Sequence, residues 1–242
     1  MLPFNQSLLI IPTYNEIMNI EKMLDRITTL YPDLDILIIE DGSPDGTAEV
    51  VKKFMAENKK VNIIERTGKL GLGTAYITGF KWALERDYQF IFEMDCDFSH
   101  DPEDIPRLLE AAQTHELVIG SRYIGGIRII NWPMHRLLLS YFAGVYTRII
   151  TGLNILDATG GFKCFSRRAL ESLDLDRVFS NGYSFQIELN FKIWAKGMRI
   201  KEVPIVFTER RDGESKMNGG IVHEAVFAVL KLRLRKIFGT LD

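Results

Sequence analysis

The hydrophobic and polar positions of the chain form two alternating patterns. Short apolar runs, each bounded by polar or turn-forming residues, predict buried strands at residues 8–11, 36–39, 61–64, 90–92 and 117–119. Between them, apolar residues recur every three or four positions, which predicts helices at residues 17–31, 48–55 and 74–84. Strands that alternate with helices in this way indicate right-handed crossovers and a mostly parallel α/β sheet covered by helices on both faces.

The pattern changes after residue 122. The apolar stretch from Leu137 to Tyr146 is too short to span a bilayer, and Val203 to Phe207 is expected to form a strand. A polar loop from Glu209 to Asn218 and a helix from about Ile221 to Phe238 are expected to follow. We therefore expect one domain over residues 1–242, in three consecutive parts: 8–122, 123–218 and 219–242.

Composition narrows the class of protein. The chain is 46% hydrophobic and 26% charged, which is typical of a globular protein and argues against a disordered, collagen-like or coiled-coil chain. A net charge of −2 gives no global positive field, so we expect no nucleic-acid partner. Cys96 and Cys164 form no CxxC pair, which fits a reducing cytoplasm. The uncharged residues 1–15 contain two prolines and predict neither a signal peptide nor a membrane span.

Ligands of parallel α/β sheets bind beyond the carboxyl ends of the strands. The loops expected at that edge each carry an acidic or basic residue: Thr13–Glu16, Glu40–Asp45, Lys69–Gly73, Asp95–Asp101 and Ser121–Tyr123. We therefore expect the chemistry of the protein to lie in these loops.

The strongest local signal is Asp95-Cys96-Asp97 at a predicted strand end. Side chains alternate along a strand, so both carboxylates are expected to face the same way. Two such oxygen ligands suit Mg²⁺ or Mn²⁺, which would complete its coordination with water and substrate phosphate oxygens. The alternative is that one aspartate caps the next helix, but Asp101 followed by Pro102 already supplies that cap.

Other motifs favour some functions and exclude others. Asp41 is either an acceptor for the base or ribose of a nucleotide or a plain turn residue. A dinucleotide fingerprint around Gly71 and Gly73 would need glycine where Tyr76 stands. Neither a P-loop nor the nucleophile elbow of a serine hydrolase occurs.

Four cationic residues stand in or beside the expected loops: Arg122, Arg136, Arg210 and Lys216. Arginine suits bidentate phosphate binding, although each of these residues taken alone is more often a solvated surface charge. The polar segment from Arg210 to Lys216 is either a lid with a glycine hinge or an ordinary exposed loop.

The last predicted helix is amphipathic and basic. Its apolar stripe of Phe227, Leu230, Leu234 and Ile237 lies near four cations, Lys231, Arg233, Arg235 and Lys236. Such a helix can lie on an anionic membrane or pack its stripe onto the protein body, and both hold if only the basic edge faces lipid. The two cysteines and the four histidines are expected to be structural or incidental.

Five motifs in order resemble the dolichol-phosphate (polyprenol-phosphate) mannose synthases of glycosyltransferase family 2. They are Pro12-Thr13-Tyr14-Asn15-Glu16, Asp41-Gly42-Ser43-Pro44-Asp45-Gly46-Thr47, Met94-Asp95-Cys96-Asp97, Gly120-Ser121-Arg122 and Gly213-Glu214-Ser215-Lys216. The resemblance runs from about residue 8 to 217. It implies a GT-A (Rossmann-like) fold and an inverting mechanism, with residues 8–122 as the nucleotide-sugar half and 123–218 as the acceptor half.

The resemblance also implies roles for particular residues. Pro12, Tyr14, Glu16 and Asp41 would hold the nucleotide. Asp95 and Asp97 would bind the donor diphosphate and the metal, with Cys96 between them where alanine is usual. Ser99 occupies a third metal-side position, where some members have glutamine. Four cations would face phosphates: Arg122, Arg136, Arg210 and Lys216.

The function implied is metal-dependent transfer of mannose from GDP-mannose to a polyprenyl (dolichyl) phosphate. A phosphate monoester is largely ionised near neutral pH, so the attacking oxygen needs no general base. The chain resembles the short, peripheral form of the family, expected at the cytoplasmic face of the membrane. Two alternatives stay open: transfer of glucose or another sugar from a UDP donor to the same lipid or a glycan, and a non-catalytic nucleotide-sugar binding module docked to a membrane protein.

Overall fold

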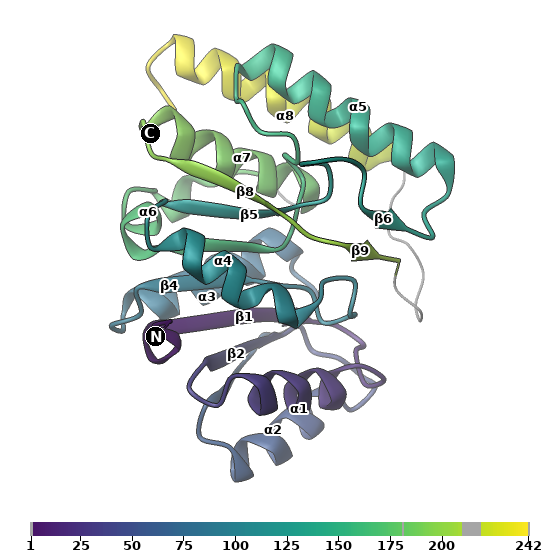
Figure 1. Ribbon diagram of the computed structural model, residues 1–242, viewed down its shortest axis with the longest axis vertical. Helices are drawn as coiled ribbons and strands as arrows, with labels where there is room; N and C mark the ends of the chain where they lie inside the picture. Colours follow the sequence, from purple (N-terminus) through teal and green to yellow (C-terminus); the bar gives the residue numbers. More distant parts are fainter. Residues whose placement is uncertain (1, 181, 210–218, 242) are drawn as a thin grey trace.

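A mostly parallel sheet organises the protein, as the computed structural model in Figure 1 shows; it describes residues 2–180, 182–209 and 219–241. Within these residues seven strands pair in the order β3-β2-β1-β4-β7-β5-β8. They are β1 (Ser7–Thr13), β2 (Asp35–Glu40), β3 (Val61–Glu65), β4 (Phe90–Glu93), β5 (Leu117–Ser121), β7 (Lys163–Ser166) and β8 (Ile200–Pro204). β7 runs antiparallel to β4 and β5, and the other neighbours are parallel. The mostly parallel sheet expected from the sequence is confirmed.

Helices cover both faces of this sheet. They are α1 (Ile20–Leu30), α2 (Thr47–Glu57), α3 (Leu72–Leu84), α4 (Ile105–Ala112), α5 (Met134–Thr151), α6 (Arg167–Glu171), α7 (Gly182–Ala195) and α8 (Gly219–Ile237). Short 3₁₀ turns occupy Phe4–Gln6, Pro102–Asp104 and Leu175–Arg177. Beside the sheet, β6 (Ile129–Ile130) pairs with β9 (Phe207–Thr208) in a parallel ribbon.

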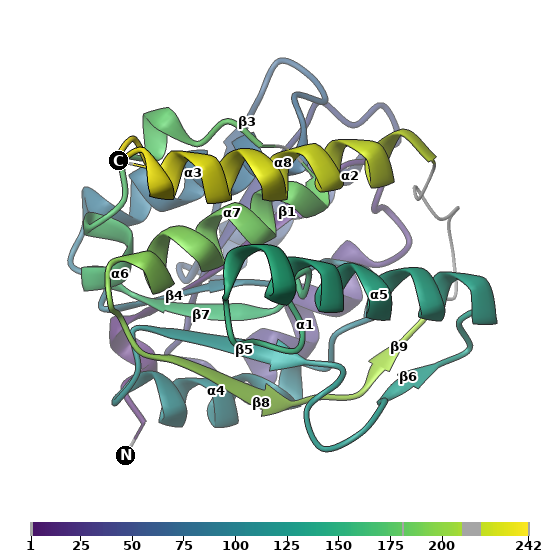
Figure 2. The same ribbon diagram turned by 90° about the horizontal axis from the view of Figure 1, so that it is seen from above.

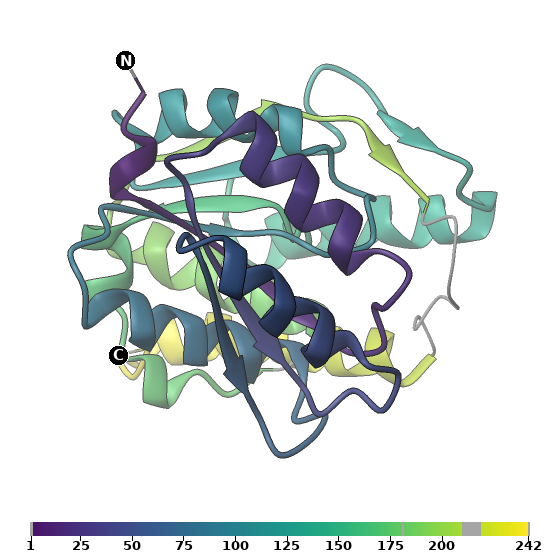
Figure 3. The same cartoon turned by 90° about the horizontal axis from the view of Figure 1, so that it is seen from below.

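Alternation along the strands produces two apolar cores. Ile10 and Ile39 point to the face covered by α3 and α7, whereas Leu9 and Ile38 point to the face covered by α1, α2 and α4. Figure 3 shows α1 and α2 side by side beneath the sheet. On the other face α5 and α8 lie over α7 as an outermost layer (Figure 2). The central strands are therefore buried on both faces, as a parallel sheet requires.

Some predicted boundaries differ from the structure. α1 begins at Ile20 rather than Ile17, because the backbone amides before it bond to side chains of the loop after β2. The strand expected at Val203 to Phe207 begins three residues earlier, as β8, and its end belongs to β9. β7 and α7 were not predicted: β7 is only four residues long, and polar residues interrupt the apolar stripe of α7.

The close packing of α3 on β1 gives a prediction about stability. A Cβ atom at Gly79 would lie 2.8 Å from two side-chain carbons of Ile10. We expect Gly79→Ala to lower the free energy of unfolding by about 1–2 kcal/mol, since overpacking outweighs the gain in helix propensity. Urea denaturation followed by circular dichroism measures the change. Gly68→Ala is the control because its Cβ would meet nothing within 4 Å, and an equal loss in both variants would contradict the packing argument.

Candidate active site

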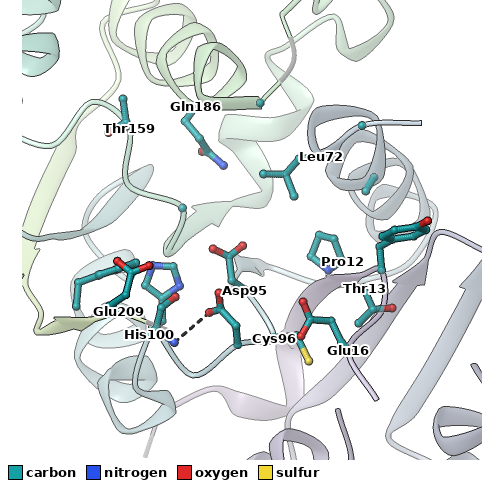
Figure 4. Close-up of a pocket in the computed structure, with 18 of the residues that line it drawn as sticks. Pro12, Thr13, Glu16, Leu72, Asp95, Cys96, His100, Thr159, Gln186 and Glu209 are labelled. Atoms are coloured by element: carbon teal, nitrogen blue, oxygen red, sulfur yellow. Dashed lines mark hydrogen bonds between the residues drawn. The ribbon is translucent and has the colours of Figure 1, made fainter. Parts of the chain in front are cut away.

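A single cavity of about 300 Å³ lies at the carboxyl ends of β1, β2 and β4. Ten of the residues singled out in the sequence line it: Pro12, Tyr14, Glu16, Asp41, Asp95, Cys96, Asp97, Ser99, Arg122 and Arg136. Figure 4 shows Pro12, Thr13 and Glu16 on one side and His100 and Glu209 on the other, with Asp95 between them. The predicted residues Arg210 and Lys216 lie outside the described residues.

The loop after β1 is fastened to the loop after β2. The Asn15 amide donates to Ser43 Oγ and the Glu16 amide donates to Thr47 Oγ1, both at 3.0 Å. Asn15 has φ of 58°, a left-handed conformation that asparagine tolerates better than most residues. Asp45 accepts from the Ile17 amide and from Thr47. Burial raises the pKa of Asp45, but these hydrogen bonds outweigh it and lower the pKa below its usual value.

Asp41 is held by a cation that the sequence analysis missed. Arg66 Nε and Nη2 donate to the two oxygens of its carboxylate at 2.6 and 2.7 Å, and both side chains are buried. Arg66 also donates to Thr74 Oγ1 and to the Gly71 carbonyl. The ion pair therefore joins the loop after β2 to the start of α3. Arg66 directly follows Glu65, just beyond the predicted strand at residues 61–64. That place beyond a strand end was the sequence signal that could have identified it.

The loop after β4 presents the two aspartates to the cavity. Cys96 is 2% exposed and packs in the apolar core, and burial raises the pKa of its thiol well above the usual value. Asp97 Oδ1 accepts from the Ser99 amide at 3.1 Å, across a turn in which Phe98 has φ of 57°. Asp101 caps the following turn by accepting from the Glu103 amide, as expected.

Two further residues of this loop face the cavity with buried polar atoms. Ser99 Oγ and His100 Nδ1 have no hydrogen-bond partner. The His100 ring packs against Phe162 and Phe207, with centroids 5.3 Å away in each case. Burial lowers the pKa of His100 to about 4, so the imidazole is neutral near pH 7. The expectation that the histidines are structural or incidental overlooked that His100 lines the cavity.

Arg122 and Arg136 line the cavity, each bonded to a carboxylate. Arg122 Nε and Nη2 donate to the buried Asp157 at 2.7 and 2.6 Å. Burial raises the pKa of Asp157, but the charge and hydrogen bonds of Arg122 outweigh it and lower the pKa. Arg136 Nη1 donates to both oxygens of Glu209 at 2.7 and 2.5 Å, and its guanidinium lies 4.0 Å from the centre of the Trp132 ring. Arg136 Nε is buried without a partner.

Several lining residues carried no recognisable sequence signal. Thr159 belongs to no recognisable motif, but its Oγ1 accepts a hydrogen bond from Arg122 Nη2 at 2.9 Å. Gln186 comes from the unpredicted helix α7, and Glu209 stood only at the edge of the predicted polar loop. Each reaches the cavity through contacts between segments far apart in the chain, which periodicity and local motifs do not encode.

Chemically, the cavity combines oxygen ligands with cations. Asp95 and Asp97 are hard oxygen donors suited to a divalent ion. In the described residues no group of three or more histidine, cysteine, aspartate or glutamate side chains is placed to hold a metal. Two carboxylates completed by water or substrate oxygens are a common arrangement for Mg²⁺.

Solved structures of glucosyl-3-phosphoglycerate synthase from Mycobacterium tuberculosis share the fold. The structure in complex with Mg²⁺ and uridine diphosphate has a TM-score of 0.69 at 21% identity and covers 93% of this chain and 78% of that one. The complex with Mn²⁺, uridine-diphosphate-glucose and phosphoglyceric acid has a TM-score of 0.67 at 21% identity, covering 94% and 79%. At this identity the likeness shows the fold alone, and it confirms the expected GT-A architecture.

Two curated relatives are much closer in sequence. The undecaprenyl-phosphate mannosyltransferase of Micrococcus luteus is 48% identical over 93% of this chain and 92% of its own length. The polyprenol monophosphomannose synthase of Mycolicibacterium smegmatis is 44% identical over 99% of this chain and 90% of its own. A sequence model of glycosyl transferase family 2 matches residues 8–174. The resemblance drawn from five motifs is therefore confirmed, and the chain is an enzyme that belongs to glycosyl transferase family 2.

Proposed function

We propose that this enzyme transfers mannose from GDP-mannose to a polyprenyl (dolichyl) phosphate, with inversion at the anomeric carbon. One observation carries the proposal: a single cavity joins the two aspartates after β4 to the loops after β1 and β2 and to two buried arginines. The names of the two close relatives support mannosyl transfer to a polyprenyl phosphate. The guanine nucleotide and the need for a metal are the finer parts of the proposal.

The nucleotide would bind at the β1 and β2 side of the cavity. Pro12 and Tyr14 offer an apolar wall, and Lys69 Nζ lies 4.7 Å from the centre of the Tyr14 ring. Glu16 and Asp41 offer carboxylates to the hydroxyl and amino groups of a nucleoside. Because Arg66 fixes both oxygens of Asp41, that carboxylate is pre-oriented and loses little freedom on binding.

Asp95 and Asp97 would hold a divalent ion, and Ser99 fits a third position. Both carboxylates line the cavity, and the buried Ser99 Oγ beside them lacks a hydrogen-bond partner. The residues present therefore fit Mg²⁺ or Mn²⁺, which would neutralise the negative charge of the departing diphosphate. The protein has to keep both carboxylates at one strand end. The turn at Phe98 and the hydrogen bond that the Ser99 amide donates to Asp97 do this.

The arginines would receive phosphate at the opposite side. Asp157 fixes the Arg122 guanidinium and balances its charge. Arg122 would therefore contribute more to orienting a phosphate than to attracting it. Arg136 is better placed to bind an anion, because its Nε is unpartnered and its carboxylate partner, Glu209, is partly exposed. A substrate phosphate would bond Arg136 in place of, or beside, Glu209. We propose that Arg210 and Lys216 complete this cationic side.

The reaction then requires alignment rather than a strong base. The ionised acceptor phosphate oxygen attacks the anomeric carbon of mannose, forming one C–O bond. The C–O bond to GDP breaks, and its electron pair leaves with the diphosphate. Holding both anions in one small cavity supplies the orientation on which the rate depends. Attack opposite the leaving group inverts the anomeric configuration.

The outer helices suggest how the enzyme reaches a lipid substrate. No helix in the described ranges has the length and apolar character to cross a membrane. Exposed apolar side chains follow one stripe of α5 and one of α8, with Phe238 directly after α8: Met134, Leu138, Tyr141, Phe142 and Ile149, and Phe227, Leu230, Leu234 and Ile237. These two helices lie side by side (Figure 2). Their stripes form the apolar face, which faces away from the protein body.

The contacts of α8 bear on one of the two expectations for the last helix, that its apolar stripe packs onto the protein body. The protein body buries Ala228, Val229 and Leu232, whereas the predicted stripe from Phe227 to Ile237 is exposed. Packing of that stripe onto the body is therefore wrong. Lys231 and Lys236 lie 3.8 and 3.7 Å from the centres of the Phe179 and Trp194 rings. We propose that the apolar face inserts into the anionic cytoplasmic leaflet, with nearby cations at the headgroups.

A donor panel tests the reaction itself. We expect purified enzyme with Mg²⁺ or Mn²⁺ to convert GDP-mannose and undecaprenyl phosphate into a lipid of the mass of undecaprenyl phosphate plus one hexose. Chelation by EDTA should abolish the product. Faster transfer from a UDP-sugar would establish the alternative donor, and nucleotide-sugar binding with neither transfer nor hydrolysis would establish a non-catalytic module.

The aspartate pair gives a prediction at one residue. Asp97→Ala should lower the rate of transfer by at least about a hundredfold, because the leaving diphosphate loses an electrostatic partner. Steady-state kinetics measure the rate, and thermal denaturation checks that the variant folds. Asp33→Ala removes an exposed aspartate on the surface and should retain wild-type activity. Wild-type activity in a folded Asp97→Ala enzyme would remove the metal assignment.

Membrane docking by the apolar face has its own test. Met134 and Met18 are 66% and 62% exposed, but only Met134 belongs to this face. We expect Met134→Glu to weaken binding to anionic lipid vesicles, since a carboxylate there resists burial and is repelled by the headgroups. Met18→Glu should bind vesicles like the wild type. Vesicle sedimentation measures both, and equal binding by the two variants would place the docking surface elsewhere.

A further inference from the structure

A buried polar cluster lies directly behind the aspartate loop and has no part in the mechanism above. Glu93 comes from β4, Lys163 from β7 and Gln186 from α7, and each is at most 2% exposed. Glu93 and Lys163 stand opposite each other in the antiparallel pairing of β4 with β7. Buried charges of this kind are costly to a fold, so their retention calls for an explanation.

Lys163 determines how Gln186 is oriented. Its Nζ donates to the Gln186 backbone carbonyl at 3.3 Å and also to the side-chain Oε1. An ammonium group has only donors, so the oxygen of the amide must face it. The amide nitrogen of Gln186, with two N–H donors, is consequently turned away from Lys163.

That nitrogen lies at the wall of the cavity and close to the Glu93 carboxylate. Gln186 lines the cavity, and its Nε2 is buried. Figure 4 shows its amide pointing across the cavity toward Asp95. Burial raises the pKa of Glu93 to about 7, while the charge of Lys163 and a side-chain hydrogen bond from Gln186 lower it. Both Glu93 oxygens are buried and, like Gln186 Nε2, make no other hydrogen bond, so Glu93 is the acceptor for one of the two N–H groups of the amide. The second N–H is left without an acceptor in the protein, and a buried donor of this kind is uncommon in native proteins unless a ligand or water completes it.

The position of Gln186 indicates which part of a ligand it would meet. The nucleotide side of the cavity is formed by Pro12, Thr13 and Glu16, and the far side by His100 and Glu209 (Figure 4). Gln186 lies between them, opposite Asp95, where the group attached to a metal-bound diphosphate would sit. A neutral amide donor suits a hydroxyl oxygen, whereas the charged arginines suit phosphate.

We propose that Gln186 Nε2 donates a hydrogen bond to a hydroxyl of the donor sugar and thereby helps to select that sugar. Lys163 is then a positioning residue that acts through Gln186. This inference rests on the proposed function, in that the ligand is a nucleotide sugar. It assigns to α7 the recognition of the sugar, separate from the nucleotide loops and from the metal.

The test compares binding of GDP with binding of GDP-mannose by calorimetry in the presence of Mg²⁺. Gln186→Met removes the donor at similar volume, and it should weaken GDP-mannose about three- to tenfold. The affinity for GDP should change by less than about twofold. Asn190→Leu is the matched control: it lies one turn further along α7, is buried, and donates to the Ala158 carbonyl outside the cavity. It should leave the ratio of the two affinities unchanged.

Monodeoxy analogues of GDP-mannose identify the contact without relying on one variant. One analogue should bind the wild type about three- to tenfold more weakly, and it should lose nothing further in Gln186→Met. If Gln186→Met does not fold, Gln186→Asn keeps the amide but withdraws it from the cavity and should show the same loss. Equal weakening of GDP and GDP-mannose, or a wild type that is indifferent to every deoxy analogue, would overturn the proposal.

These outcomes are separate from failure of the proposed function. If the wild type prefers a UDP-sugar, the assigned donor is wrong. The comparison between UDP and that UDP-sugar then still decides whether Gln186 contacts the sugar.

Discussion

Two carboxylates at the end of one strand impose the constraint on which the rest of the site depends. Asp95 and Asp97 line the same cavity, and their mutual repulsion is relieved only by nearby positive charge. Parallel strands bring the loops after β1, β2 and β4 to the same edge of the sheet. The fold therefore gathers several loops around two neighbouring carboxylates, which suit a divalent ion.

The surrounding ion pairs make that edge rigid. Asp41 is fixed by Arg66, Asp157 fixes Arg122, and Glu209 holds Arg136. Removing one partner of a buried pair typically costs about 3–5 kcal/mol, because the remaining charge stays buried. The loops are thus fixed before a ligand arrives, so substrate binding costs little conformational entropy. We infer a similar role for Lys163, whose buried charge orients the neutral side-chain amide of Gln186.

Much of this architecture was predictable from local sequence, and the reasons are physical. The predicted strands at 8–11 and 36–39 became β1 and β2 because continuous apolar runs are buried on both sides of a parallel sheet. Most lining residues before position 123 followed from the rule that ligands bind beyond strand ends, although Ala75 lies outside the expected loops and Pro12 came from the family resemblance. β7 was not predicted because a strand of four residues, ending in Ser166, is too short to show a hydrophobic periodicity. α7 was not predicted because buried polar residues interrupt its apolar stripe.

The partners of the charged residues could not be predicted in the same way. Arg66 is 25 positions from Asp41, Asp157 is 35 from Arg122, and Glu209 is 73 from Arg136. Local periodicity contains no information on such pairings.

The central claim is that Asp95 and Asp97 hold a divalent ion at the nucleotide site. Its most direct test is the affinity of the wild-type enzyme for GDP, measured by calorimetry with Mg²⁺ or Mn²⁺ and again with EDTA. The account predicts binding at least about tenfold tighter with the ion. Equal affinity under both conditions would contradict it.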